Sequence, residues 1–352
     1  MSVPSAEEQV AFLARVQRLL DEGVFVSTYK LALLMALLDL AVERGEDSGE
    51  PMRIPLDAIA ERVIGYYWRQ VVPYAPAPGR GAPTVLAQNS GGPAAILAHV
   101  RQLREQCGGS LALARRDAPR WAATVREVRR VLRVMPLWKL QVVGGAPLEF
   151  LYPHRLAGEA LELLPGVAWN LRRFHGLVKG LVESAWVRQV RRIRENQVLL
   201  GEAADLGEFL FGSERASLAD YRPVLREVQS GACFYCRRPL HATGEVDHFI
   251  PWSRYPVDLP HNFVLAHAQC NRDKRDFLGD LWHLEHWVER NAAQGDLLAR
   301  EFDSLRVVHD LTASRHVVRW SYAQAEQAGA RVWLREDELR PLAPGWRALL
   351  PA

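Results

Sequence analysis

The chain has 352 residues and contains no run of about 20 apolar residues, the length that spans a lipid bilayer. Its longest apolar stretch, Leu31 to Val42, is interrupted by Asp39 and predicts a buried helix. The first residues lack the basic and then apolar pattern of a secretion signal. Only four cysteines are present, too few for a disulfide scaffold in a chain of this length. We therefore expect a cytoplasmic protein that has no membrane partner.

The chain has little excess of either charge sign, since its formal net charge is only +3. The charges are unevenly distributed, however. Residues 101–200 contain 18 Lys and Arg against 8 Asp and Glu, a local balance of +10, whereas residues 1–50 carry −5 and residues 201–352 carry −4. Such a basic segment predicts a surface that faces a polyanion, and the alternative is an arginine-rich face that is merely solvated.

Hydrophobic residues make up 49% of the chain and charged residues 24%, which is typical of a globular protein with more than one core. Helical spacing of apolar residues dominates, so we predict a mainly α protein with a small α+β domain. Alternation in residues 137–143 and 148–152, around Gly144 and Gly145, predicts a β-hairpin. A stretch rich in Pro and Gly, 73–93, predicts a long loop. The predicted helices cover residues 5–20, 28–44, 56–71, 93–106, 117–133, 167–197, 217–229, 278–291 and 296–311, followed by a short helical tail that includes Trp320 and Trp333.

Two of the predicted helices carry rows of arginine. A row of arginines along one helix face can follow a phosphate backbone, so both rows are candidate nucleic-acid contacts. The first row is Arg126, Arg129, Arg130 and Arg133, and the second contains Arg188, Arg191 and Arg192.

Three of the four cysteines lie in one segment. Cys233 and Cys236 form a C-x2-C pair, and His267 and Cys270 form an H-x2-C pair. Two chelating pairs at this separation predict a tetrahedral structural zinc site. The alternatives are a redox-active C-x2-C pair, or a zinc site in which His241 replaces His267.

Between these pairs, β-branched and aromatic residues around Asp247 and His248 predict a strand that runs into a loop. Asn262 follows in the loop, and Asn271 lies on the next predicted helix. Carboxylate and amide oxygens can hold a divalent cation that keeps water ligands. Such a cation neutralises charge on a phosphate, and an imidazole can accept a proton from the attacking water. These residue types predict hydrolysis of phosphodiester bonds.

Residues 232–277 resemble the HNH endonuclease family, whose nuclease unit is a β-hairpin followed by a helix that holds one catalytic metal ion. The resemblance implies that His248 is the general base and that Asp247 is a ligand of the catalytic metal. It implies that Asn262 braces the loop and so positions the base. The third signature position, commonly histidine, is Asn271 here, which makes the chain an H-N-N variant able to hold Mg²⁺ or Mn²⁺.

The same resemblance assigns the remaining residues of the motif. Cys233, Cys236, His267 and Cys270 match the zinc-stapled members of the family, in which the zinc ion is structural. Lys274 matches the basic residue of a C-N-x-x-K ending, which implies a contact with phosphate. Two neighbouring arginines, Arg254 and Arg272, are further candidates for backbone contacts, with unpartnered surface arginines as the alternative.

From these observations we predict four segments. They are an N-terminal helical domain over residues 1–165 that contains the β-hairpin and senses a signal or binds a partner, a basic connector over 166–230, the nuclease domain over 231–290, and a helical region over 291–352. The predicted activity is hydrolysis of DNA that depends on a divalent metal. A large helical region attached to such a unit resembles effector nucleases of bacterial restriction and phage-defence systems, which implies other defence proteins as partners. The alternatives are a non-catalytic zinc-containing adaptor and an RNA endonuclease.

Overall fold

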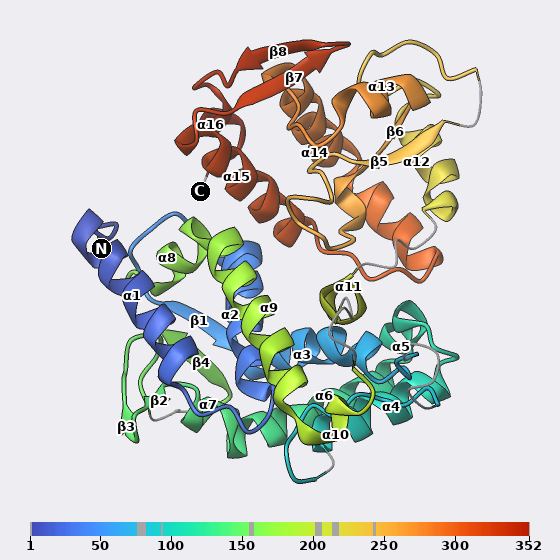
Figure 1. The fold of residues 1–352 in the computed structure, drawn as a ribbon. Coiled ribbons are helices and arrows are strands. Elements are labelled where there is room, and N and C mark those ends of the chain that lie inside the picture. Colours follow the sequence, from blue (N-terminus) through green and yellow to red (C-terminus); the bar gives the residue numbers. More distant parts are fainter. Residues whose placement is uncertain are drawn as a thin grey trace. The chain divides into compact units, whose positions relative to one another are not determined.

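The computed structural model describes residues 2–75, 82–92, 94–154, 158–200, 206–212, 218–241 and 244–351. The chain divides into two compact units, Met1–Ser213 and Glu214–Ala352 (Figure 1). Both are mainly helical, and each sheet in the described residues has two strands. The predicted fold class is therefore confirmed. No helix of the described residues combines the length and the apolar character needed to cross a membrane.

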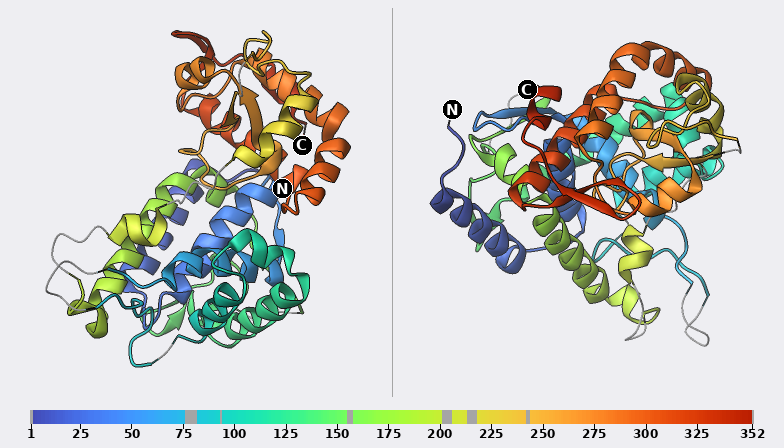
Figure 2. Two further views of the ribbon diagram at one scale, coloured as in Figure 1. Left: turned by 90° about the vertical axis from the view of Figure 1, so that its right-hand side faces the viewer. Right: turned by 90° about the horizontal axis from the view of Figure 1, so that it is seen from above.

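The first unit contains two antiparallel strand pairs, β1 (Met52–Pro55) with β4 (Ala160–Leu163) and β2 (Val142–Val143) with β3 (Ala146–Pro147). Its helices, drawn from two further sides in Figure 2, are α1 (Ala6–Glu22), α2 (Tyr29–Arg44), α3 (Leu56–Gln70), α4 (Ala95–Gln106), α5 (Leu111–Arg116), α6 (Ala118–Val134), α7 (Pro136–Lys139), α8 (Val167–Arg173), α9 (His175–Arg192), α10 (Arg194–Gln197) and α11 (Leu206–Phe211).

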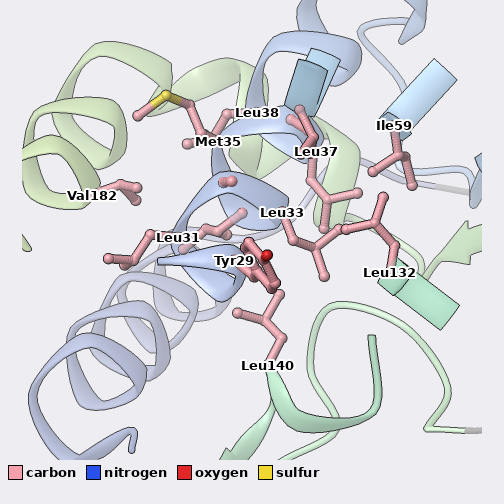
Figure 3. Close-up of a cluster of buried hydrophobic side chains, with 14 of the residues drawn as sticks. Tyr29, Leu31, Leu33, Met35, Leu37, Leu38, Ile59, Leu132, Leu140 and Val182 are labelled. Atoms are coloured by element: carbon pink, nitrogen blue, oxygen red, sulfur yellow. The ribbon is translucent and has the colours of Figure 1, made fainter. Parts of the chain in front are cut away.

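Helix α2 forms the centre of this unit. It is buried along nearly its whole length and packs against α3, α8 and α9. Figure 3 shows its side chains meeting Ile59 of α3, Leu132 of α6 and Val182 of α9. Burial of each large apolar side chain stabilises the fold by about 1.5–3 kcal/mol. Asp39, the polar residue that interrupts the apolar run, is also buried. Its carboxylate accepts a hydrogen bond from Tyr66 (2.6 Å) and forms another with His175 Nε2 (2.9 Å).

The hairpin predicted over residues 137–143 and 148–152 is much shorter than expected. Residues 136–139 form helix α7, which begins with Pro136, and the strands keep only two residues each beside Gly144 and Gly145. Gln141 explains why the second predicted strand, residues 148–152, does not pair. Its side-chain oxygen accepts hydrogen bonds from the backbone N–H groups of Phe150 (3.0 Å) and Leu151 (2.7 Å). A buried amide thus takes the place of a partner strand.

Several predicted boundaries fall outside the described residues. The loop predicted over 73–93 includes residues 76–81 and 93, and the helices predicted from 93 and 217 begin on such positions. The described parts of the loop contain isolated strand bridges, such as Tyr74 with Thr84, and no helix.

The second unit is built around an antiparallel hairpin and a following helix. Strands β5 (Glu245–His248) and β6 (Phe263–Ala266) pair with Glu245 opposite Ala266 and His248 opposite Phe263. The other elements are η1 (Ala219–Tyr221), α12 (Arg222–Val228), η2 (Pro260–Asn262), α13 (Ala268–Lys274), α14 (Leu281–Ser304), α15 (Leu311–Gln327), β7 (Arg331–Arg335), β8 (Glu338–Pro341) and α16 (Trp346–Leu349).

Helix α14 supports the hairpin. Its Trp287 stacks on Phe249, with 5.7 Å between ring centroids, and its buried Arg290 donates to the backbone oxygens of Phe263 and His261, each at 2.6 Å. This arrangement differs from the prediction. Helix α14 continues through residues 292–295, where a break between two helices was expected, and it ends at Ser304, before the predicted end at 311. Trp333 lies in β7 and not in a helix, because its backbone pairs with Leu278 and Asp280.

The buried ring of His261 predicts acid sensitivity of the second unit. Burial, aided by the nearby Arg290 guanidinium, lowers its pKa from 6.5 to about 4. The unfolded chain therefore binds a proton that the folded unit does not, so stability is complete above pH 6.5 and falls as the pH drops toward 4. We expect His261→Phe to remove part of this dependence, worth up to roughly 3 kcal/mol.

The measurement is denaturant unfolding of both proteins between pH 5 and 7.5 with zinc present, followed by tryptophan fluorescence. Since zinc affinity changes with pH in both proteins alike, the difference between them reports the histidine. Equal slopes of stability against pH would contradict the prediction.

Candidate functional site

Cys233, Cys236, His267 and Cys270 form a compact group, as their spacing predicted. Their potential ligand atoms all lie within 4.8 Å of one another. The first pair comes from the turn before β5, and the second pair comes from the start of α13. A group of three sulfurs and one imidazole nitrogen matches the donors of structural zinc sites. The described residues thus contain a Cys3His zinc-binding group, and His241, the alternative ligand, is exposed and outside it.

The hydrogen bonds of this group prepare it for a metal cation. A hydrogen bond from the Cys270 thiol, helped by backbone N–H groups, lowers the pKa of Cys233, although burial of the sulfur opposes this. His267 Nε2 lies 3.1 Å from the carbonyl oxygen of Pro239, which can only accept. Nε2 must therefore donate, and Nδ1, 3.3 Å from the Cys236 sulfur, carries the lone pair that a metal requires.

Asp247 lies on β5 and is held from two sides. Its Oδ2 accepts a hydrogen bond from Tyr235 (2.5 Å) and forms an ion pair with Lys274 Nζ (3.0 Å). Tyr235 stands between Cys233 and Cys236 in the sequence, so a residue of the zinc knuckle reaches this carboxylate. Among the described residues Oδ1 has no hydrogen bond or ion pair, so it can serve as a ligand for a divalent cation.

Lys274 is bound within the second unit. Its side chain is fully buried, and its ammonium also donates to the backbone oxygen of His248 (2.9 Å) and lies 5.7 Å from the centre of the Tyr235 ring. The C-N-x-x-K ending implied a contact between this cation and a phosphate. In the structure it instead ties α13 to the end of β5.

We expect Lys274→Met to lower the free energy of unfolding of the second unit by roughly 3 kcal/mol, because it removes one partner of a buried ion pair. Arg272→Met is a matched control, since Arg272 is exposed on the same helix and its loss should change stability by less than about 0.5 kcal/mol. Thermal unfolding followed by circular dichroism measures both. Equal stability of the two variants would show that the ion pair contributes little.

Asn271 lies one turn before Lys274 on α13 and faces the same strand. Its Nδ2 donates to Glu245 Oε2 (3.0 Å), and Glu245 shares a face of β5 with Asp247 because strand residues alternate. This bond leaves the amide oxygen of Asn271 as the atom available for a cation. Glu245 was missed by the sequence analysis, although its position two residues before Asp247 is a usable signal.

His248 ends strand β5. Its ring packs edge-on against Trp252 and Phe263, at centroid distances of 5.1 and 5.0 Å, and its Nε2 lies 2.9 Å from Asp258 Oδ1. Asp258 was also missed, and no pattern in the sequence marks it.

Asn262 closes the loop between the two strands. Its side chain accepts from the backbone N–H of Ile250 (2.8 Å) and donates to the oxygen of the same residue (3.0 Å). Its own backbone oxygen accepts from Phe249 (2.8 Å). These bonds fit the bracing position that the family resemblance implied.

The arginine row on α6 is largely neutralised. Arg129 pairs with Asp57 and Glu159 (both 3.1 Å), Arg133 pairs with Glu159, and Arg130 pairs with Glu127. Arg126 alone of this row has no ion pair within the described ranges. The positive potential is therefore smaller than the residue count suggested.

The remaining predicted contacts are distributed over both units. On α9, Arg188 and Arg192 are exposed and Arg191 is half-buried. In the second unit Arg272 is exposed, whereas Arg254 is half-buried and burial lowers its pKa. Exposure alone makes Arg188, Arg192 and Arg272 the most accessible of these cations.

Comparison with known proteins gives two family matches. Residues 10–138 match a domain of unknown function (DUF8808), and residues 233–279 match the HNH endonuclease family. No curated protein and no solved structure matches the chain. The second match begins at the first zinc-binding cysteine and includes β5, β6 and α13. The segment over residues 233–279, which contains the Cys3His zinc-binding group, therefore matches the HNH endonuclease family.

Proposed function

We propose that the chain is an endonuclease that hydrolyses DNA phosphodiester bonds with the help of one divalent cation, Mg²⁺ or Mn²⁺. The observation that carries the proposal is that helix α13 packs against strand β5. Among the described residues, one carboxylate oxygen of Asp247 has no protein partner, and the amide oxygen of Asn271 is oriented by Glu245. These two oxygens are hard donors that suit such a cation.

Each residue then has a defined task. Asp247 and Asn271 would hold the divalent cation, which supplies charge neutralisation for the phosphate and the leaving oxygen. His248 removes a proton from the attacking water. Asn262 holds the loop that follows the base, and Lys274 fixes the strand end that carries it. The zinc-binding group stabilises α13, which carries Asn271.

We take DNA as the substrate, with RNA as the alternative that the experiment distinguishes. The exposed Arg188, Arg192 and Arg272 can contact the phosphates of the substrate. One centre in one chain would nick a single strand, whereas cutting both strands needs a second copy or a second encounter. We further propose a role as effector in bacterial phage defence or restriction, with other proteins of such a system as partners. A separate unit of 213 residues attached to the nuclease unit supports this role.

The test uses the full zinc-loaded chain and supercoiled plasmid. We expect conversion to open-circular or linear DNA with Mg²⁺, Mn²⁺ or Ni²⁺ and none with a chelator that spares the zinc. Single-stranded and structured RNA are incubated in parallel. Cleavage of RNA alone would replace DNA as the substrate, and intact plasmid and RNA under every condition would favour a non-catalytic adaptor.

A further inference from the structure

The environment of His248 leaves one ring nitrogen for chemistry. Nε2 is engaged by Asp258 at 2.9 Å, and the ring makes T-shaped contacts with Trp252 and Phe263. Nδ1 has no hydrogen-bonding partner among the described residues. A neutral imidazole carries its proton on one nitrogen only, so the partner of Nε2 decides which nitrogen can act as a base.

The path of the loop explains how an aspartate ten residues away reaches the ring. Asn262 clamps the backbone of Ile250 at the start of the loop, and its N–H donates to the oxygen of Leu259 near the end (2.8 Å). Leu259 and Tyr255 are buried and fix the intervening chain. Asp258 lies next to Leu259 and is only partly exposed, with 32% of its side chain accessible.

We propose that Asp258 is a positioning residue for the base, an inference that rests on the proposed nuclease function. Its carboxylate accepts the Nε2–H of His248 and so holds the tautomer in which Nδ1 has the lone pair. In the reaction a water O–H bond breaks and an Nδ1–H bond forms. The resulting hydroxide bonds to phosphorus, the bond from phosphorus to the leaving oxygen breaks, and that oxygen takes a proton from solvent.

Asp258 then acts a second time, as the partner of a charged ring. Once Nδ1 is protonated, the imidazolium lies 2.9 Å from a carboxylate, and an ionised acceptor makes a stronger hydrogen bond than a neutral one. The two roles can be separated. Asp258→Asn keeps an oxygen that can accept Nε2–H but loses the negative charge, whereas Asp258→Ala loses both.

The first measurement needs no activity. Long-range proton–nitrogen NMR of protein labelled with ¹⁵N-histidine, recorded at pH 8 without substrate, distinguishes the two tautomers, and His248→Gln assigns the signal. We expect the Nε2–H form in wild type and Asp258→Asn, and a mixture of forms in Asp258→Ala. The same tautomer in wild type and Asp258→Ala would overturn the proposal.

The second measurement is plasmid cleavage. We expect Asp258→Ala to lower kcat at least tenfold with KM within twofold of wild type, and Asp258→Asn to have a smaller effect. Asp296→Asn, an equal loss of charge at an exposed site on α14, should behave as wild type. A raised KM with unchanged kcat would assign Asp258 to DNA binding instead. Inactive wild type would refute the nuclease function, while the NMR result would still decide the role of Asp258.

Discussion

Plasmid cleavage by His248→Ala will be slower than by wild type by about 10²- to 10⁴-fold, the usual contribution of a general base. Three other histidines of the second unit are buried or engaged elsewhere. His261 and His283 are buried with their pKa values lowered to about 4, mainly by burial, and His267 belongs to the zinc-binding group. The measurement is the initial rate of loss of supercoiled plasmid at saturating Mg²⁺ or Mn²⁺.

The control must show that the variant is folded. Zinc content, circular dichroism and DNA affinity should equal those of wild type, because the ring contributes little besides its contacts with Trp252, Asp258 and Phe263. Asp296→Asn serves as the matched variant. A His248→Ala protein that is folded and cleaves at the wild-type rate would refute the assigned base.

Loss of the zinc ion will have the largest effect on stability. Zinc would join the turn before β5 to the start of α13, and binding of a structural zinc ion contributes on the order of 10 kcal/mol to the folding of small domains. We expect Cys270→Ser to lose zinc and unfold the hairpin and α13. The measurements are metal analysis, thermal unfolding and limited proteolysis.

Cys107→Ser provides the comparison for this experiment. Cys107 is buried in the first unit and lies outside the zinc-binding group, so its variant should retain zinc and the resistance of the second unit to protease. Proteolysis of Cys270→Ser should begin within residues 233–279. If Cys270→Ser stays as stable as Cys107→Ser, the four side chains do not bind a structural metal.

The candidate site was predictable where short spacings determine it. Two chelating pairs can meet around one ion only if the chain between them folds back, so Cys233 and Cys270 were predicted to lie together. Asp258 and Lys274 were not predictable in this way. The partner of His248 depends on how a loop of ten residues is packed, and the surroundings of Lys274 depend on Tyr235 and Asp247, which come from earlier parts of the chain.

In the fold, too, a local sequence pattern was predictive and long-range pairing was not. The apolar run from Leu31 to Val42 identified the central helix α2. The one charged residue within that run, Asp39, forms hydrogen bonds with side chains of α3 and α9. Strands β1 and β4 pair although they are far apart in sequence, and each has only four residues. Strands this short have too few alternating positions to be recognised before the partner is known.

The hydroxyl of Tyr235 connects the zinc-binding group to Asp247, the proposed ligand of the catalytic cation. Tyr235 is placed by the cysteines on either side of it, and it donates to the carboxylate proposed to hold the catalytic cation. We therefore expect metals to load in a fixed order, with zinc first. A newly made chain in a zinc-starved cell would be unable to cut DNA, however much magnesium surrounded it.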